Sequence, residues 1–228
     1  MIVNWDTGKR VSTYDYFTWQ TQVASAGATE IVFRTDNMRS TKWPLQEAKK
    51  RFLNYIWPGP GLHRIPCRIG TDGDAEIGSI HMQDLPENFT RMRSVLPPDS
   101  ERYTVTLRQT FHNTFKNSDQ DLWREFANRI RARVIEDHAV EPIGLYERMA
   151  LYAGAHMNFG VPNGPVSILW YTPYPLCMVS DPATSAKSWG GHGYKPGDRI
   201  KFLLDNQSVV WAKPTMDILM REFERMQR

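Results

Sequence analysis

Residues that can hold a negatively charged group occur together in one turn, Asn163-Gly164-Pro165. The apolar run His156–Val161 precedes this turn, and a second apolar run follows it and ends at Tyr171. If the first run is a strand and the second a helix, the turn lies where open α/β sheets bind ligands. Amides at a helix start attract an anion, glycine permits close approach of the backbone, and proline is tolerated in the first helical turn. The turn therefore predicts a phosphate site, although the same residues also make an ordinary tight connection.

A second polar segment carries two cations after another β-branched run. Arg108 closes the run Tyr103–Arg108, and Lys116 follows eight residues later in a polar loop. A guanidinium at a strand end offers a planar fork to a diphosphate, and an ammonium group offers a point charge. We expect Arg108 to be exposed at the edge of a cleft, where it would contribute little to stability. An ordinary charged surface loop is the alternative for this segment.

Other classes of chemistry lack their motifs in the sequence. It contains no Gly-x-Ser-x-Gly elbow, no Walker loop, no His-Glu-x-x-His and no Cys-x-x-Cys. The two cysteines, Cys67 and Cys177, are far apart and have apolar or proline neighbours, which favours buried free thiols over a metal site. We expect no metal and no cofactor.

The composition is typical of a globular protein, with 228 residues of which 41% are hydrophobic and 23% are charged. The net charge of +3 is mild and suits an anionic small molecule, so we expect no nucleic-acid partner. No apolar run approaches the roughly 20 residues that span a bilayer, and residues 1–6 do not resemble a signal peptide. We expect a cytoplasmic protein without a transmembrane segment.

Strand-like and helix-like patterns alternate in the first half of the chain. The expected strands are Ile2–Trp5, Glu30–Arg34, His63–Ile69 and Ile77–Met82, and the expected helices are Tyr16–Ala26 and Leu45–Trp57. Prolines at 97 and 98 then interrupt the pattern and mark the best domain boundary.

The alternation is clearer in the second half. The expected strands are Tyr103–Arg108, Val134–Glu136, His156–Val161 and Leu176–Val179, and the expected helices are Asp119–Arg133, Gly144–Ala153, Gly164–Tyr171 and Thr215–Met226. Such alternation is typical of parallel sheets. We therefore predict an α/β protein with two small Rossmann-like lobes around a cleft, residues 1–98 and 99–228. The second lobe is expected to be a doubly wound parallel sheet.

Four segments of the second half occur in the order found in one known family and cover most of Tyr103–Arg228. They are TVTLRQTFHNTFKNSDQDLWREFA, VIED, GLYERMALYAGAHMNFGVPNGPVSILW and YKPGDRIKFLLDNQSVVWAKPTMDIL. They resemble the nucleotide-sugar-binding half of GT-B glycosyltransferases, especially the ADP-heptose:lipopolysaccharide heptosyltransferase-like group and related surface-carbohydrate biosynthesis proteins. In the first half, VSTYDYFTWQTQVASAGATEIVF resembles the opening helix and second strand of that family.

The resemblance implies a GT-B-like fold and a glycosyltransferase that moves a sugar from a nucleotide-diphosphate sugar to a carbohydrate acceptor. The first lobe would be the acceptor side, and the second lobe would bind the donor. Glu147 would reach the ribose or sugar hydroxyls, unless it is an ordinary solvated residue of its helix. The donor-site residues are thus Arg108, Lys116, Glu147, Asn163, Gly164 and Pro165.

In an inverting reaction, a carboxylate of the first lobe would deprotonate the acceptor hydroxyl. Asp6 and Asp15 flank the first strand-to-helix loop and are the candidates, with Asp36 as a third. Two other classes stay open. One is a non-catalytic nucleotide or phospho-sugar binding module on a reduced GT-B-like scaffold, and the other is a hydrolase or epimerase on the same scaffold.

Overall fold

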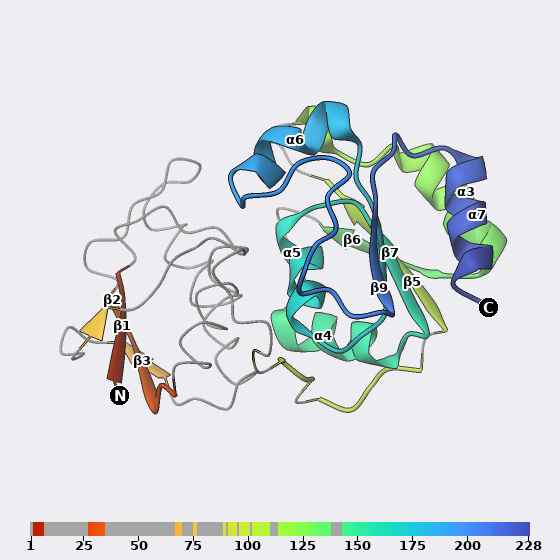
Figure 1. Ribbon diagram of the computed structural model, residues 1–228. Helices are drawn as coiled ribbons and strands as arrows, with labels where there is room; N and C mark the ends of the chain where they lie inside the picture. The colour runs from red at the N-terminus through yellow and green to blue at the C-terminus, as the bar shows by residue number, and fades with distance from the viewer. Residues whose placement is uncertain are drawn as a thin grey trace.

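A computed structural model describes residues 2–6, 27–34, 67–69, 75–76, 89, 91–94, 96–100, 102–109, 114–137 and 143–228. These residues form an α/β protein with two separate parallel sheets, one from each half of the sequence (Figure 1). The expected α/β class is therefore confirmed.

The first sheet contains four parallel strands in the order β3-β2-β1-β4. They are β1 (Ile2–Asp6), β2 (Glu30–Arg34), β3 (Cys67–Ile69) and β4 (Ala75–Glu76). Strands β1 and β2 lie where the sequence predicts them. Strand β3 covers the last three residues of the predicted strand His63–Ile69. The two expected helices and the expected strand Ile77–Met82 lie outside the described residues.

The second sheet contains five parallel strands in the order β6-β5-β7-β8-β9 (Figure 1). They are β5 (Tyr103–Arg108), β6 (Arg133–Asp137), β7 (Met157–Gly160), β8 (Leu176–Val179) and β9 (Gln207–Val210). The prediction of a parallel second sheet is confirmed. Because β5 pairs with both β6 and β7, the direction in which strands are added reverses at β5.

Helices cover both faces of this sheet (Figure 1). The helical segments are η4 (Thr114–Lys116), α3 (Gln120–Ile130), α4 (Leu145–Gly154), α5 (Gly164–Ser167), η5 (Ile168–Tyr171), α6 (Pro182–Gly190) and α7 (Met216–Arg225), where η marks a 3-10 helix. The residues Tyr103, Val105 and Leu107 of β5 belong to one core cluster, together with buried side chains of α3 and α7. The other face carries α4 and α5, whose buried side chains belong to a second cluster. The second sheet is thus doubly wound.

Three details differ from the sequence predictions. The helix expected to end at Arg133 ends at Ile130, because Arg131 has a left-handed backbone conformation with φ 55° that turns the chain into β6. The segment expected as one helix up to Tyr171 is the short helix α5 followed by η5. Helix α6 and strand β9 were not predicted.

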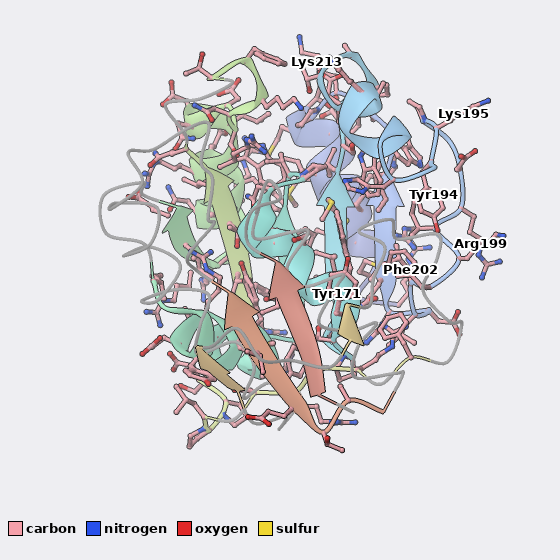
Figure 2. The ribbon with its side chains drawn as sticks, turned by 90° about the vertical axis from the view of Figure 1, so that its left-hand side faces the viewer. Tyr171, Tyr194, Lys195, Arg199, Phe202 and Lys213 are labelled. Atoms are coloured by element: carbon pink, nitrogen blue, oxygen red, sulfur yellow. The ribbon has the colours of Figure 1, made fainter. Side chains whose placement is uncertain are left out.

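Residues 89 and 91–94, which precede the predicted domain boundary, pack against the second half of the chain. The Met92 N–H donates to the Tyr171 carbonyl at 2.7 Å. The Arg91 guanidinium donates to the carbonyls of Trp170 and Phe202 at 3.0 and 2.5 Å. The Tyr171 ring stacks on the Phe202 ring, with centroids 6.3 Å apart and 9° between the ring planes (Figure 2). This segment, assigned by sequence to the first lobe, therefore packs on η5.

Cys177 in β8 is a buried free thiol, as the sequence predicts. Burial raises its pKa to about 12, which keeps the sulfur protonated and unreactive at neutral pH. The side chain of Cys67 is not among those described. In the described part of the chain, no helix combines the length and the apolar character needed to cross a bilayer.

Gly154 provides a direct test of how α4 packs. A Cβ at this position would lie 1.5 Å from the Asp99 carbonyl oxygen, and the Asp99 N–H already donates to the Ala150 carbonyl at 3.1 Å. Because backbone must move to relieve this clash, we expect Gly154→Ala to lower the free energy of unfolding by about 1–3 kcal/mol or more. Chemical denaturation monitored by circular dichroism measures the change.

The matched control is Gly190→Ala at the end of α6. No atom lies within 4 Å of a Cβ built on Gly190, so alanine is expected to be neutral or stabilising by up to about 1 kcal/mol. Equal effects of the two substitutions would contradict the packing of α4 on residues 96–100.

Candidate functional site

The carboxyl edge of the second sheet contains a topological switch point between β5 and β7. The two strands are parallel neighbours, with Thr106 opposite Gly160, whereas β6 pairs on the other side of β5. The connections that follow β5 and β7 therefore run to opposite faces of the sheet. Open α/β sheets bind ligands in the crevice that this divergence leaves. The described residues of interest at this edge are 109, 114–119 and 161–163.

Arg108 links the two loops. Its Nη1 donates a hydrogen bond of 2.9 Å to the Pro162 carbonyl, across 54 residues of sequence. Its backbone N–H donates to Ser118 Oγ at 2.9 Å, so the following loop is fastened to the same residue. The side chain is half-buried, so the expectation of an exposed Arg108 is wrong, while its small contribution to stability stays a prediction. The structure brings Arg108 and the turn at Asn163 together, while phosphate binding there stays a prediction.

The side-chain amide of Asn163 is buried, and among the described residues only its oxygen has a hydrogen-bond partner. The side chain is 8% exposed, and its Oδ1 accepts the Val166 N–H at 2.7 Å, as in a helix N-cap. This bond fixes which atom is the oxygen, so Nδ2 is the donor. Nδ2 is buried and has no acceptor among the described residues. An unpaired buried donor costs about 1–3 kcal/mol, which an external acceptor such as a phosphate oxygen would remove.

The helix start offers fewer amides than the sequence suggests. Helix α5 has four residues, Pro165 has no N–H, and the Val166 and Ser167 amides donate to Asn163 side-chain and backbone oxygens. In this described turn, the Gly164 N–H is the amide left for a ligand. The role of Gly164 and of the helix start at Pro165 in an anion site stays a prediction. An anion here would depend on the side chains of Arg108 and Asn163.

Lys116 ends η4 in the loop that follows β5, on the same side of the sheet as Arg108. It is half-buried, and its ammonium group lies 5.7 Å from the ring centroid of Phe115, which is 65% exposed. The carboxylate of this loop, Asp119, accepts the Leu122 N–H at 3.2 Å and caps α3. The described residues of the loop thus present a cation and an aromatic ring, with the carboxylate engaged.

Glu147 lies in the first turn of α4 and is exposed. Its carboxylate lies over the start of the helix. A Cβ atom built on Gly144, the residue before the helix, would be only 2.2 Å from Glu147 Oε2. Since α4 follows β6, this end of the helix belongs to the same carboxyl edge. The role of Glu147 toward ribose or sugar hydroxyls stays a prediction.

A column of buried polar side chains, which sequence reasoning missed, lies beneath Arg108 on the same face of β5. Thr106 Oγ1 is 3.0 Å from Tyr152 Oη, and Arg148 Nη1 donates to the same Tyr152 oxygen at 3.3 Å. Arg148 is only 1% exposed. The signal in the sequence was the spacing of four between Arg148 and Tyr152, which places both on one face of a helix.

The carboxylates proposed as bases belong to the first half of the chain. Asp6 is the last residue of β1, opposite Arg34 in β2, and β4 pairs on the other side of β1. Asp6 therefore stands at the switch point of the first sheet, the counterpart of Arg108 in the second. Asp15 and Asp36 lie outside the described residues.

Comparisons with known proteins give no relative: no family model matches this chain, and neither a curated protein nor a solved structure does. The resemblance to GT-B glycosyltransferases therefore stays a hypothesis.

Asn163→Ser tests whether the unpaired amide binds a ligand. Serine retains an oxygen that caps Val166 but lacks the amide, so the free energy of unfolding should stay constant or rise by up to about 1 kcal/mol. Affinity for a nucleoside diphosphate should fall roughly ten-fold, which corresponds to about 1.4 kcal/mol. Denaturation and isothermal calorimetry measure the two effects.

Asn158→Ser is the matched control, because the Asn158 amide is buried and paired with the carbonyls of Tyr152 and Pro175 at 3.1 and 2.9 Å. This substitution should lower stability by about 1–3 kcal/mol through the unpaired carbonyls. If Asn163→Ser destabilised the protein as much, or left nucleotide affinity unchanged, the ligand role of Asn163 would be wrong.

Proposed function

We propose that this protein is a glycosyltransferase that binds a nucleotide-diphosphate sugar at the carboxyl edge of its second sheet and transfers the sugar to a carbohydrate acceptor. The observation that carries the proposal is the buried Asn163 Nδ2, without an acceptor among the described residues, beside the Arg108–Pro162 bond at the switch point. A diphosphate supplies the acceptor oxygens that such donors require.

Cations and carboxylates both lie around this edge. Arg108 ends β5, Lys116 follows in η4, and the buried Arg148 lies under the same face. Asp137 ends β6 opposite Arg108, and Asp119 is occupied as the cap of α3. Arg108 and Lys116 are the cations that we assign to the diphosphate. Arg108 Nη1 donates a hydrogen bond to the Pro162 carbonyl. The Pro162 bond orients the fork before a ligand arrives, which lowers the entropy lost on binding.

Transfer with inversion would proceed in one displacement. The acceptor oxygen forms a bond to the anomeric carbon while the bond from that carbon to the β-phosphate oxygen breaks, and a carboxylate takes the acceptor proton. Asp6 is the described candidate for this base, because it ends β1 at the switch point of the first sheet. Arg108 and Lys116 would stabilise the charge that develops on the departing diphosphate. Glu147 would hold the ribose or sugar hydroxyls.

Ligand screening and turnover assays separate this proposal from its alternatives. A nucleoside diphosphate at 100 times its Kd should add about 2.7 kcal/mol to the free energy of unfolding. Stabilisation by a nucleotide sugar without turnover would indicate a binding module. Release of the sugar without an acceptor would indicate a hydrolase, and an altered sugar on an intact donor would indicate an epimerase. No stabilisation by any nucleotide or nucleotide sugar would contradict a donor site.

Arg108→Gln tests the diphosphate contact. Loss of a charged donor is worth roughly 1.5–3 kcal/mol, so affinity for the matching nucleoside diphosphate should fall about ten- to a hundred-fold. Because the Pro162 bond is also weakened, stability should fall by about 1 kcal/mol, and calorimetry must be done on protein shown to be folded. Arg129→Gln is the control, since Arg129 forms an exposed pair with Glu125 on α3. Equal affinities of the two variants would exclude Arg108 from the site.

Asp6→Asn tests the base separately from donor binding. Loss of a general base should lower kcat by roughly 10²- to 10⁴-fold, while donor affinity stays within about two-fold of the parent. Steady-state kinetics and calorimetry with the same donor measure both quantities. Unchanged kcat with intact binding would assign the base to another carboxylate.

A further inference from the structure

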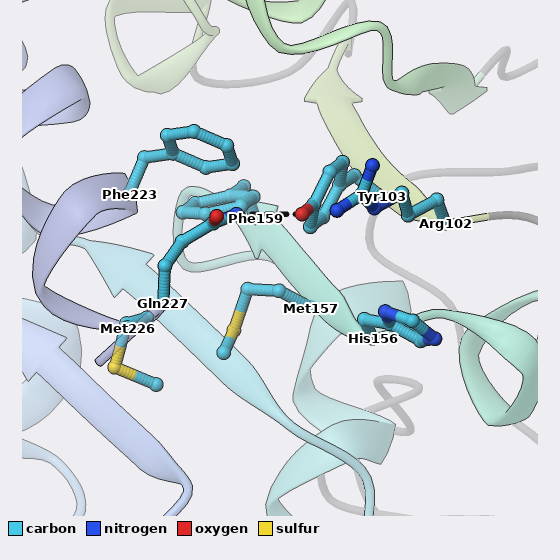
Figure 3. Close-up of a pocket in the computed structure, with 8 residues that line it drawn as sticks. All are labelled: Arg102, Tyr103, His156, Met157, Phe159, Phe223, Met226 and Gln227. Atoms are coloured by element: carbon cyan, nitrogen blue, oxygen red, sulfur yellow. Dashed lines mark hydrogen bonds between the residues drawn. The ribbon is translucent and has the colours of Figure 1, made fainter.

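A cavity of about 260 Å³ opens at the amino edge of the second sheet, where β5 and β7 begin and α7 ends (Figure 3). Tyr103 and Met157, the first residues of the two strands, line it. It is therefore at the opposite edge of the sheet from Arg108 and Asn163, and the proposed transfer reaction does not use it.

Aromatic rings and thioethers contribute to the inner wall of this cavity. Met157 and Phe159 contribute buried side chains from β7, and Phe223 and Met226 come from the end of α7. The Phe223 ring packs edge-on against the Tyr103 ring, with centroids 5.2 Å apart and 78° between the ring planes. Thioethers adapt to the shape of a ligand and contact aromatic rings favourably. The rings and thioethers of this wall can contact a flat aromatic molecule.

The mouth of the cavity is polar and positively charged. Arg102, His156 and Gln227 are exposed, and the residues that line the cavity include no carboxylate. The Arg102 guanidinium lies 5.2 Å from the Tyr103 ring centroid, and Gln227 Nε2 donates to Tyr103 Oη at 2.5 Å (Figure 3). The His156 ring meets the Tyr103 ring edge-on at 6.5 Å. Arg102, His156 and Gln227 therefore surround Tyr103. The Arg102 guanidinium gives this mouth a permanent positive charge.

The size of the cavity limits its ligand to one or two rings. Its volume exceeds the ~150 Å³ of an apolar cavity that holds benzene, and it lies just below the ~300 Å³ at which drug-sized pockets begin. We propose that this cavity binds a small aromatic carboxylate. The rings lie against Met157, Met226 and Phe223, and the carboxylate faces Arg102. The proposal is independent of the glycosyltransferase function.

Methionine methyl groups report on this cavity directly. In protein labelled with ¹³C at the methionine methyls, Met157→Ile and Met226→Ile assign the two resonances of the cavity. Met178 is buried in the core cluster on the opposite face of the sheet and is the internal reference. Titration with indole-3-acetate and benzoate should shift Met157 and Met226 saturably and leave Met178 unchanged. The neutral amides of both acids should bind roughly ten-fold more weakly, because they lack the charge that Arg102 recognises.

Arg102→Gln should remove the preference for acid over amide, while binding of the amides stays the same. Arg93→Gln, at an exposed arginine that does not line the cavity, should retain the full preference. An unchanged Met178 resonance shows that each variant is folded. The proposal is overturned if neither acid shifts Met157 and Met226, if the amides bind as tightly as the acids, or if Arg102→Gln keeps the ten-fold preference.

Discussion

The second sheet depends on the position of β5, from which the chain adds strands in two directions. Connection through α3 leads to β6 on one side, and connection through α4 leads back across β5 to β7 on the other. Parallel connections are right-handed, so a reversal of direction places α3 on one face and α4 and α5 on the other, as Figure 1 shows. The loops after β5 and β7 must then diverge. In open α/β sheets such a divergence leaves a crevice, and the residues at the strand ends decide what fills it.

Buried polar groups join β5 and β7 below their carboxyl ends. The Asn158 amide has its donors paired with two carbonyls, and its oxygen accepts from Thr104 Oγ1 at 2.6 Å, so this group stabilises the packing. Asn163, in the connection that follows β7, is also buried, yet its Nδ2 has no acceptor among the described residues. This contrast between two asparagines five positions apart is the reason for proposing Asn163, and not Asn158, as a ligand group.

Much of the fold could be predicted because its strands are short β-branched runs between turn residues. The ends of β2, β5 and β8 agree with prediction for this reason. Helix α6 was missed although Asp181 and Pro182 form a recognisable helix start, because its remaining residues show no apolar stripe. At the site, the pairing of Arg108 with the Asn163 turn followed from parallel strands. The burial of Arg148 could not be predicted, because a helical arginine is usually solvated and only tertiary packing decides otherwise.

The most direct test of the central claim is a crystal structure of the protein with a nucleoside diphosphate bound. If the donor binds at the switch point between β5 and β7, phosphate oxygens should lie at hydrogen-bond distance, about 2.7–3.2 Å, from both Asn163 Nδ2 and the Arg108 guanidinium. The Arg108–Pro162 bond and the cap from Asn163 to Val166 should be retained. A diphosphate bound at the amino edge beside Arg102, with Asn163 Nδ2 still lacking a ligand contact, would contradict a donor site at the carboxyl edge.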